Sequence, residues 1–208
     1  MRRLRPQLLR CLTAVALATV LGGCGGLLPD PGPPPTLYTL TPKSTFRDDL
    51  PTSTRQLVVE EPRAAGALAT QSIAIRTDPV ELQYFAGARW TERAPRLIQT
   101  LLVESFENTA RIVAVGREAI GLRSDYNLRS DLREFQAEYE DPDSPPLVRV
   151  RINAKLIRQP RREIVASQAF EHTARATGVS TRAAIIAFDE ALGKVLRRVV
   201  EWTLMTME

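Results

Sequence analysis

The chain has 208 residues, with 28 lysines and arginines against 24 aspartates and glutamates, one histidine and two cysteines. The formal net charge of +4 comes from four arginines among the first ten residues, so the rest of the chain is neutral. A neutral domain lacks the basic face that nucleic-acid binding requires, and we therefore expect no nucleic-acid partner.

Residues 1–23 have the pattern of a secretory signal peptide, in which an arginine-rich start precedes a short apolar run and small residues. The run CLTAVALATVL is eleven residues long, whereas a membrane-spanning helix needs about 20. It ends in Leu21-Gly22-Gly23-Cys24, which resembles the bacterial lipobox. We therefore predict cleavage before Cys24 and lipidation of Cys24 with acyl chains such as palmitate. The alternative is a cleaved periplasmic protein in which this cysteine has no role.

Residues 24–35 are predicted to be a tether, because five prolines and three glycines in this stretch favour an extended chain without a core. The folded domain is then predicted over residues 36–208. With Cys11 removed and Cys24 acylated, this domain has no thiol left for a disulfide, a metal site or a nucleophile.

Short strands are predicted first, at TLYTL (36–40) and RQLVVEEP (55–62). The segments SIAIRT (72–77) and VELQYF (80–85) are separated by a turn-forming Asp78-Pro79, which predicts a β-hairpin. After them, apolar residues recur every three or four positions from Ala94 to Phe106 and predict an amphipathic helix. Thr91 is the expected cap of this helix.

Residues 111–116 (RIVAVG) and 148–156 are predicted strands, the second with one apolar and one charged face. The alternation that begins at Tyr126 changes phase before Phe135, which predicts a bulge or bend. The acidic, proline-containing segment 137–146 is predicted to be a solvated loop. It lacks the glycine and the ligand spacing of a calcium site.

The last element is a long amphipathic helix, predicted from a Ser180-Thr181 cap to about Leu204. In total the pattern predicts about six to seven strands and two helices in a mixed β-sheet with both helices packed on it. This is an α/β fold, with α+β as the alternative.

No catalytic motif is found, and we expect neither an enzyme nor a cofactor or metal site. The single histidine, His172, shares a strand face with Phe170 and Ala174, which favours a partly buried structural role over a catalytic base or ligand. Trp90 and Trp202 are expected to pack in or beside the core.

Arg158, Arg161 and Arg162 surround Pro160 in the segment RQPRRE, with a charged stripe of Arg149, Arg151 and Lys155 leading to it. These arginines are candidates for contact with a partner protein or with anionic lipid headgroups. The alternative is that a hairpin tip is charged only to stay soluble and unpaired.

The order of these segments resembles the family of ABC-type transport auxiliary lipoproteins. The segments that carry the resemblance are LYTL, LVVEEP, IAIRTDPVELQYFAGARWTERAPRLIQTLLVESF, DYNLRSDLREF and AAIIAFDEALGKVLRRVVEWTL. Members of this family accompany Mce-domain (MlaD-like) and paraquat-inducible-type systems for lipid transport between membranes. The resemblance implies a fold similar to the amino-terminal domain of TolB and an auxiliary lipoprotein domain over residues 36–208.

The resemblance further implies anchorage through Cys24 and a non-catalytic role beside an Mce/MlaD-like protein and its ABC permease and ATPase. It is also compatible with a homo-oligomer. Gly25 stands where an inner-membrane retention signal would have aspartate, so we expect the outer membrane, with the protein on its inner leaflet facing the periplasm. The alternative function is a structural or assembly lipoprotein of the outer membrane without a transporter partner.

Overall fold

The computed structural model describes residues 33–117, 124–141 and 143–207, and its sheet is organised around one long strand, β7 (Tyr126–Glu138). Along one edge, β7 pairs antiparallel with β8 (Leu147–Arg158), and β8 pairs antiparallel with β9 (Glu163–Arg175). Along the other edge, three shorter strands follow one another in parallel pairing. They are β2 (Ser53–Val59), β3 (Arg63–Ala64) and β4 (Ser72–Asp78).

The remaining strands extend the sheet from β2 and β4. β6 (Ile112–Gly116) pairs parallel with β2, whereas β5 (Glu81–Trp90) forms the antiparallel hairpin with β4. β1 (Thr36–Tyr38) pairs parallel with β5. The described residues thus form a nine-stranded mixed sheet. The predicted fold class is confirmed, but six to seven strands was too few, partly because the two-residue β3 has no periodic signal.

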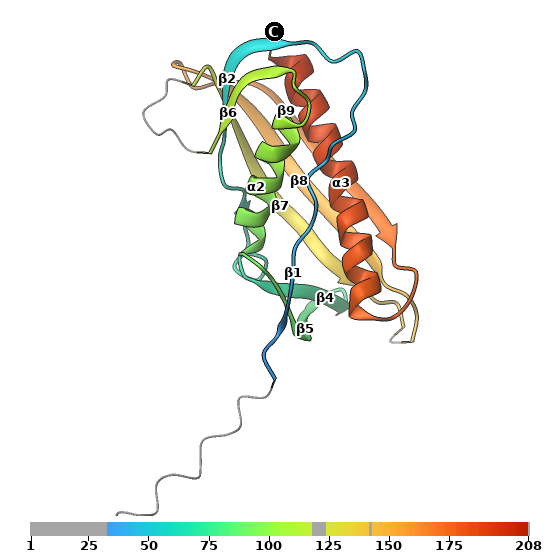
Figure 1. Ribbon diagram of the computed structural model, residues 1–208. Coiled ribbons are helices and arrows are strands. Elements are labelled where there is room, and N and C mark those ends of the chain that lie inside the picture. The colour runs from blue at the N-terminus through green and yellow to red at the C-terminus, as the bar shows by residue number, and fades with distance from the viewer. Residues whose placement is uncertain (1–32, 118–123, 142, 208) are drawn as a thin grey trace, which may run out of the picture. The chain divides into compact units, whose positions relative to one another are not determined.

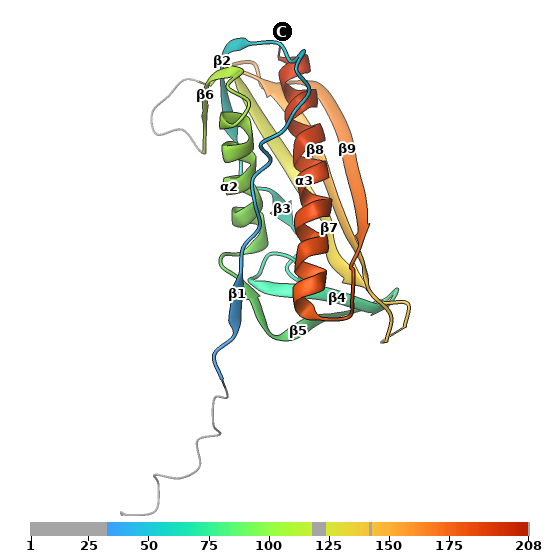
Figure 2. The ribbon, with the colours of Figure 1, turned by 45° about the vertical axis from the view of Figure 1, so that its right-hand side comes forward.

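Both helices lie on the same face of the sheet, as Figures 1 and 2 show. They are α2 (Ala94–Glu107) and α3 (Thr181–Thr206). Val148, Val150 and Ile152 of β8 are buried on the helix side, and the residues between them are polar. The strand alternation therefore separates a packed face from a polar one, as the sequence predicts.

A bulge in β7 keeps its apolar side chains on the packed face. The pairing with β8 shifts register between Leu132 and Glu134. Leu128 and Leu132 are buried before the shift, and Phe135 and Ala137 are buried after it. The predicted phase change is confirmed, because without the extra residue Phe135 would face the polar side.

α3 begins as the sequence predicts and α2 does not. The Ser180 hydroxyl accepts a hydrogen bond from the Ala183 amide and caps α3. α2 starts after Arg93 without a side-chain cap, and the Thr91 amide instead donates to the Tyr38 carbonyl. The predicted Thr91 cap is wrong, because Thr91 continues the pairing of β5 with β1 and the helix begins only after Arg93.

The segment 39–52 runs along the outer side of the helix layer between α2 and α3 and passes in front of α3 before it enters β2 (Figures 1 and 2). Its Thr41 amide and hydroxyl donate to the Asp189 carboxylate of α3, at 2.7 to 2.9 Å. Its Lys43 amide donates to Ser105 of α2 at 2.9 Å. We call this segment the strap, since it connects the two helices from outside.

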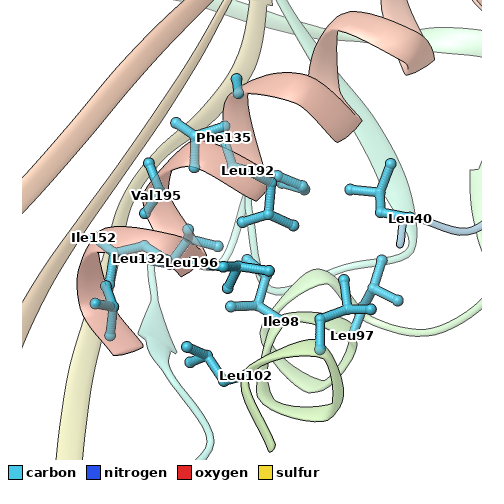
Figure 3. Close-up of a cluster of buried hydrophobic side chains, with 14 of the residues drawn as sticks. Leu40, Leu97, Ile98, Leu102, Leu132, Phe135, Ile152, Leu192, Val195 and Leu196 are labelled. Atoms are coloured by element: carbon cyan, nitrogen blue, oxygen red, sulfur yellow. The ribbon is translucent and has the colours of Figure 1, made fainter. Parts of the chain in front are cut away.

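The core lies between the helices, the sheet and the strap. Figure 3 shows Leu40 of the strap beside Leu97 and Ile98 of α2, with Leu192 of α3 opposite. Trp90, Phe135 and Phe188 pack together with ring centroids 5.0 to 5.4 Å apart. Burial of each such side chain contributes about 1.5 to 3 kcal/mol, so this core can hold the domain without disulfides.

Candidate functional site

The predicted lipidation site Cys24, the signal peptide 1–23 and most of the tether 24–35 lie outside the described residues. The chain divides into two compact units at Pro34–Pro35, and the second unit runs from Pro35 to Glu208. The candidate surfaces described below all belong to this second unit.

The three predicted contact arginines lie together at the turn between β8 and β9, but in different environments. The Arg158 guanidinium lies over the Tyr126 ring, 5.9 Å from its centroid, and 3.6 Å from the Glu163 carboxylate. Arg161 and Arg162 are exposed and have no carboxylate within 4.0 Å among the described residues. The tip therefore has one arginine held against the domain and two available for contact, and their role stays a prediction.

The charged stripe that leads to this tip is not a free basic surface. The Arg149 guanidinium lies 3.1 Å from the Glu138 carboxylate and 2.5 Å from that of Glu171, on the strands at either side. Arg151 lies 3.9 Å from the same Glu171. Carboxylates from β7 and β9 thus pair with Arg149 and Arg151, which sequence alternation within β8 alone does not show. Lys155, the third member of the stripe, is exposed and has no carboxylate within 4.0 Å among the described residues.

The carboxylate of Glu138 is the centre of this polar network. Burial alone would raise its pKa, but hydrogen bonds from Arg149 and Gln136, with the charges of Arg149 and Arg76, hold its pKa below the usual range. The pKa of Glu60 is lowered in the same way. Burial raises this pKa, but the hydrogen bonds that Glu60 accepts from Arg129 and Asn127 lower it by more. These carboxylates stay ionised in the folded protein and have no proton to exchange near neutral pH.

His172 is half-buried between β9 and α3, as the sequence predicts. Burial lowers its pKa, and the charges of Arg198 and Lys194 lower it further against the opposing effect of Glu190. Sequence reasoning missed that Lys194, Arg197 and Arg198 of α3 gather beside it around one hollow. The sequence does contain a signal for this cluster, because Arg197 and Arg198 follow Lys194 by three and four residues and therefore lie on the same side of the helix.

The two tryptophans pack in and beside the core, as the sequence predicts. Trp90 is fully buried in the core, and Trp202 packs edge-to-face on Phe170 at 5.5 Å. Among residues 33–117, 124–141 and 143–207, no three side chains of the His, Cys, Asp and Glu types are placed to hold a metal ion. None of the helices in these ranges is long and apolar enough to cross a membrane.

Comparison with protein families gives one match that spans most of the chain. Residues 38–200 match the model of a family described as the ABC-type transport auxiliary lipoprotein component. An uncharacterised protein of Bradyrhizobium diazoefficiens is 29% identical over 157 residues. The match covers 75% of this chain and 41% of that protein, so the chain spans less than half of the relative's length.

Solved structures share the fold. A Xanthomonas campestris protein of the DUF330 family superimposes with a TM-score of 0.77 at 34% identity, over 82% of this chain and 95% of its own. The structure of a second, uncharacterised protein superimposes with a TM-score of 0.65 at 14% identity, over 82% of this chain and 99% of its own. The second shows similarity of fold alone.

Proposed function

Because the chain belongs to the family of ABC-type transport auxiliary lipoprotein components, we propose that it is the accessory lipoprotein of an Mce-type ABC transporter. In this role it assists lipid transport between membranes by docking and non-catalytic binding. The family match over residues 38–200, which spans almost the whole folded unit, carries the proposal. The predicted lipidation of Cys24 provides the membrane anchor.

The position of the arginine tip supports docking at the end of the folded domain opposite to β1. In both views β1, the first strand after the tether, lies at one end of the domain, and the β8–β9 turn lies at the opposite end (Figures 1 and 2). Arg161 and Arg162 are exposed at that turn. These two exposed arginines, at the opposite end of the domain from β1, are suited to contact an acidic surface of a transporter subunit.

The proposed role includes no catalytic step and no cofactor. The sequence has one histidine and none of the nucleophile, phosphate-loop or metalloprotease motifs. We place the protein on the inner leaflet of the outer membrane, facing the periplasm, on the basis of Gly25. The wild type is expected in the outer-membrane fraction, and a Gly25→Asp variant in the inner-membrane fraction of cells whose sorting reads aspartate at this position. Wild type in the inner-membrane fraction would contradict the placement, and unchanged fractionation of the variant would contradict the argument from Gly25.

The experiment that tests the function is crosslinking in intact cells, followed by purification of the tagged lipoprotein in detergent and mass spectrometry. We expect an Mce-domain protein together with its permease and ATPase. A Cys24→Ser variant serves as the control, because loss of the anchor should lower the yield of these partners. Recovery of peptidoglycan fragments or a β-barrel assembly component in their place would contradict the proposal. The mass of the purified protein also tests the predicted self-association.

A further inference from the structure

A groove between α3 and β9 lies outside the arginine tip and has no role in the docking argument. It consists of two adjoining hollows of about 350 and about 320 Å³. Arg198 and Glu201 line both of them, so the hollows form one continuous surface. We call it the α3–β9 groove. Hollows of this size match small ligands and headgroups, whereas stable protein interfaces are larger and flatter.

One hollow of the groove carries an excess of positive charge, because three cationic side chains and a single carboxylate, that of Glu201, are among its lining residues. Arg197 pairs with Glu201 at 2.8 Å, which leaves this pair neutral. Lys194 is exposed, with no carboxylate within 4.0 Å in the described part of the chain. Arg198 donates to the main-chain carbonyl of Glu171, a neutral acceptor. Two cationic side chains beside His172 therefore favour a bound anion.

The adjoining hollow has an apolar wall on the side away from Lys194, next to the Arg47 guanidinium of the strap, which pairs with Asp49 and whose Nη1 lies 3.6 Å from the Met205 sulfur. Trp202 packs on the buried Phe170 ring and forms part of its wall. Met205 is 51% exposed and lines the same hollow. An exposed methionine beside a half-buried tryptophan is a surface that apolar chains bind readily. A cationic hollow joined to an apolar one is complementary to an amphiphile with an anionic head.

We propose that the α3–β9 groove binds an anionic phospholipid, with the phosphate between Lys194 and Arg198 and the glycerol and first acyl carbons against Trp202 and Met205. This inference rests on the proposed function, because it names the ligand that an auxiliary protein of lipid transport would hold. The apolar hollow favours a lipid over free phosphate, which would contact only the cationic part.

The test uses the full acylated protein in a non-ionic detergent, titrated with dihexanoyl phosphatidylglycerol below its micelle concentration and followed by calorimetry. Lys194→Glu is expected to weaken binding at least about tenfold, because it removes a charge-assisted hydrogen bond and adds repulsion. Arg182→Glu is the matched control, since Arg182 is exposed on the same helix outside the groove. Met205→Asn should weaken binding a few-fold.

Phosphatidylcholine and inorganic phosphate test separately whether the groove requires an anionic head and whether it requires an acyl chain. Dihexanoyl phosphatidylcholine should bind at least about fivefold more weakly than phosphatidylglycerol, since it has no net charge. Equal affinity for both lipids, equal affinity for inorganic phosphate, or equal losses in Lys194→Glu and Arg182→Glu would each overturn the proposal. Thermal melting of every variant shows that it is folded, and Met205→Asn remains informative should Lys194→Glu unfold.

The proposal of lipid binding in the groove and the proposal of docking on a transporter can be contradicted independently. If Lys194→Glu loses phosphatidylglycerol but still copurifies with the Mce-domain protein, the groove binds lipid independently of docking. If the wild-type protein binds no phosphatidylglycerol while it still copurifies with the transporter, the groove proposal is overturned and the proposed function stands. Lipid binding without transporter copurification would support the groove and contradict the docking role.

Discussion

Glu138 lies where β4, β7 and β8 meet, and its carboxylate accepts from Arg149 and Gln136. Its side chain is 22% exposed, so solvent screens these bonds only in part. We expect Glu138→Gln to lower the free energy of unfolding at pH 7 by about 1 kcal/mol, measured by urea denaturation. Arg133→Gln is the control, because the Arg133–Asp131 pair is more exposed and should change stability by less than about 0.5 kcal/mol.

The same carboxylate gives a pH dependence with a defined sign. The folded-state pKa of Glu138 lies below its unfolded value of about 4.3, so its ionised form favours the folded state. This contribution is complete above the unfolded pKa and is lost as the pH falls through the folded pKa. The difference between wild type and Glu138→Gln should therefore shrink from pH 7 to pH 3. A difference that stays constant over this range would show that the charge of Glu138 is not the cause.

At the scale of elements, α3 depends on its cap. The Ser180 hydroxyl satisfies the Ala183 amide, one of the free donors in the first turn. Ser180→Ala should lower the free energy of unfolding by about 1 kcal/mol. Thr177→Ala, in the exposed loop before the helix, is the control and should be nearly neutral. Equal effects of both substitutions on the urea midpoint would show that the cap contributes nothing.

The strap is a second element whose attachment can be tested. Thr41 donates twice to Asp189, and we expect Asp189→Ala to release this part of the strap from α3. Hydrogen exchange of the Thr41 amide should then accelerate at least about tenfold, while the core amides of β8 keep their protection. Glu190→Ala removes the neighbouring exposed carboxylate and should leave the Thr41 amide protected. Faster exchange in both variants would mean that the helix itself has loosened.

Features that depend on residues close in sequence could be predicted from the sequence, whereas arrangements that bring distant residues together could not. The α3 cap, the β4–β5 hairpin and the β7 bulge depend on residues close in sequence, and all three are confirmed. The network around Arg149 joins Glu138 and Glu171 across three strands, so alternation within β8 could not show it. The α3–β9 groove likewise requires His172 and Lys194 to be brought together by packing.

At the scale of the whole molecule, the domain has a polar sheet face on which several arginines pair with carboxylates, and cationic side chains elsewhere that have no such partner among the described residues. Arg149 and Arg129 are neutralised by carboxylates of neighbouring strands. Arg161 and Arg162 at one end, and Lys194 in the groove, have no carboxylate within 4.0 Å among the described residues. Since residues 24–208 are neutral overall, an acidic partner or an anionic ligand would gain from contact at these local positive charges.

The arginine tip offers the sharpest test of docking by the whole molecule. Arg161→Glu together with Arg162→Glu reverses two exposed charges without touching Arg158, which packs on Tyr126. We expect the yield of transporter subunits crosslinked in cells to fall at least about fivefold, since like charges across an interface repel. Arg182→Glu is the control for a charge change elsewhere on the surface.

The melting temperature of this double variant should equal that of the wild type, because neither side chain contributes to the core. Its affinity for phosphatidylglycerol should also be unchanged, because the tip and the α3–β9 groove share no residue. An unchanged crosslinking yield would assign the tip arginines to solubility of the hairpin alone and move the docking surface elsewhere on the domain. A fall in crosslinking with lipid binding intact would separate the two functions on one fold, docking at the β8–β9 turn and ligand binding beside α3.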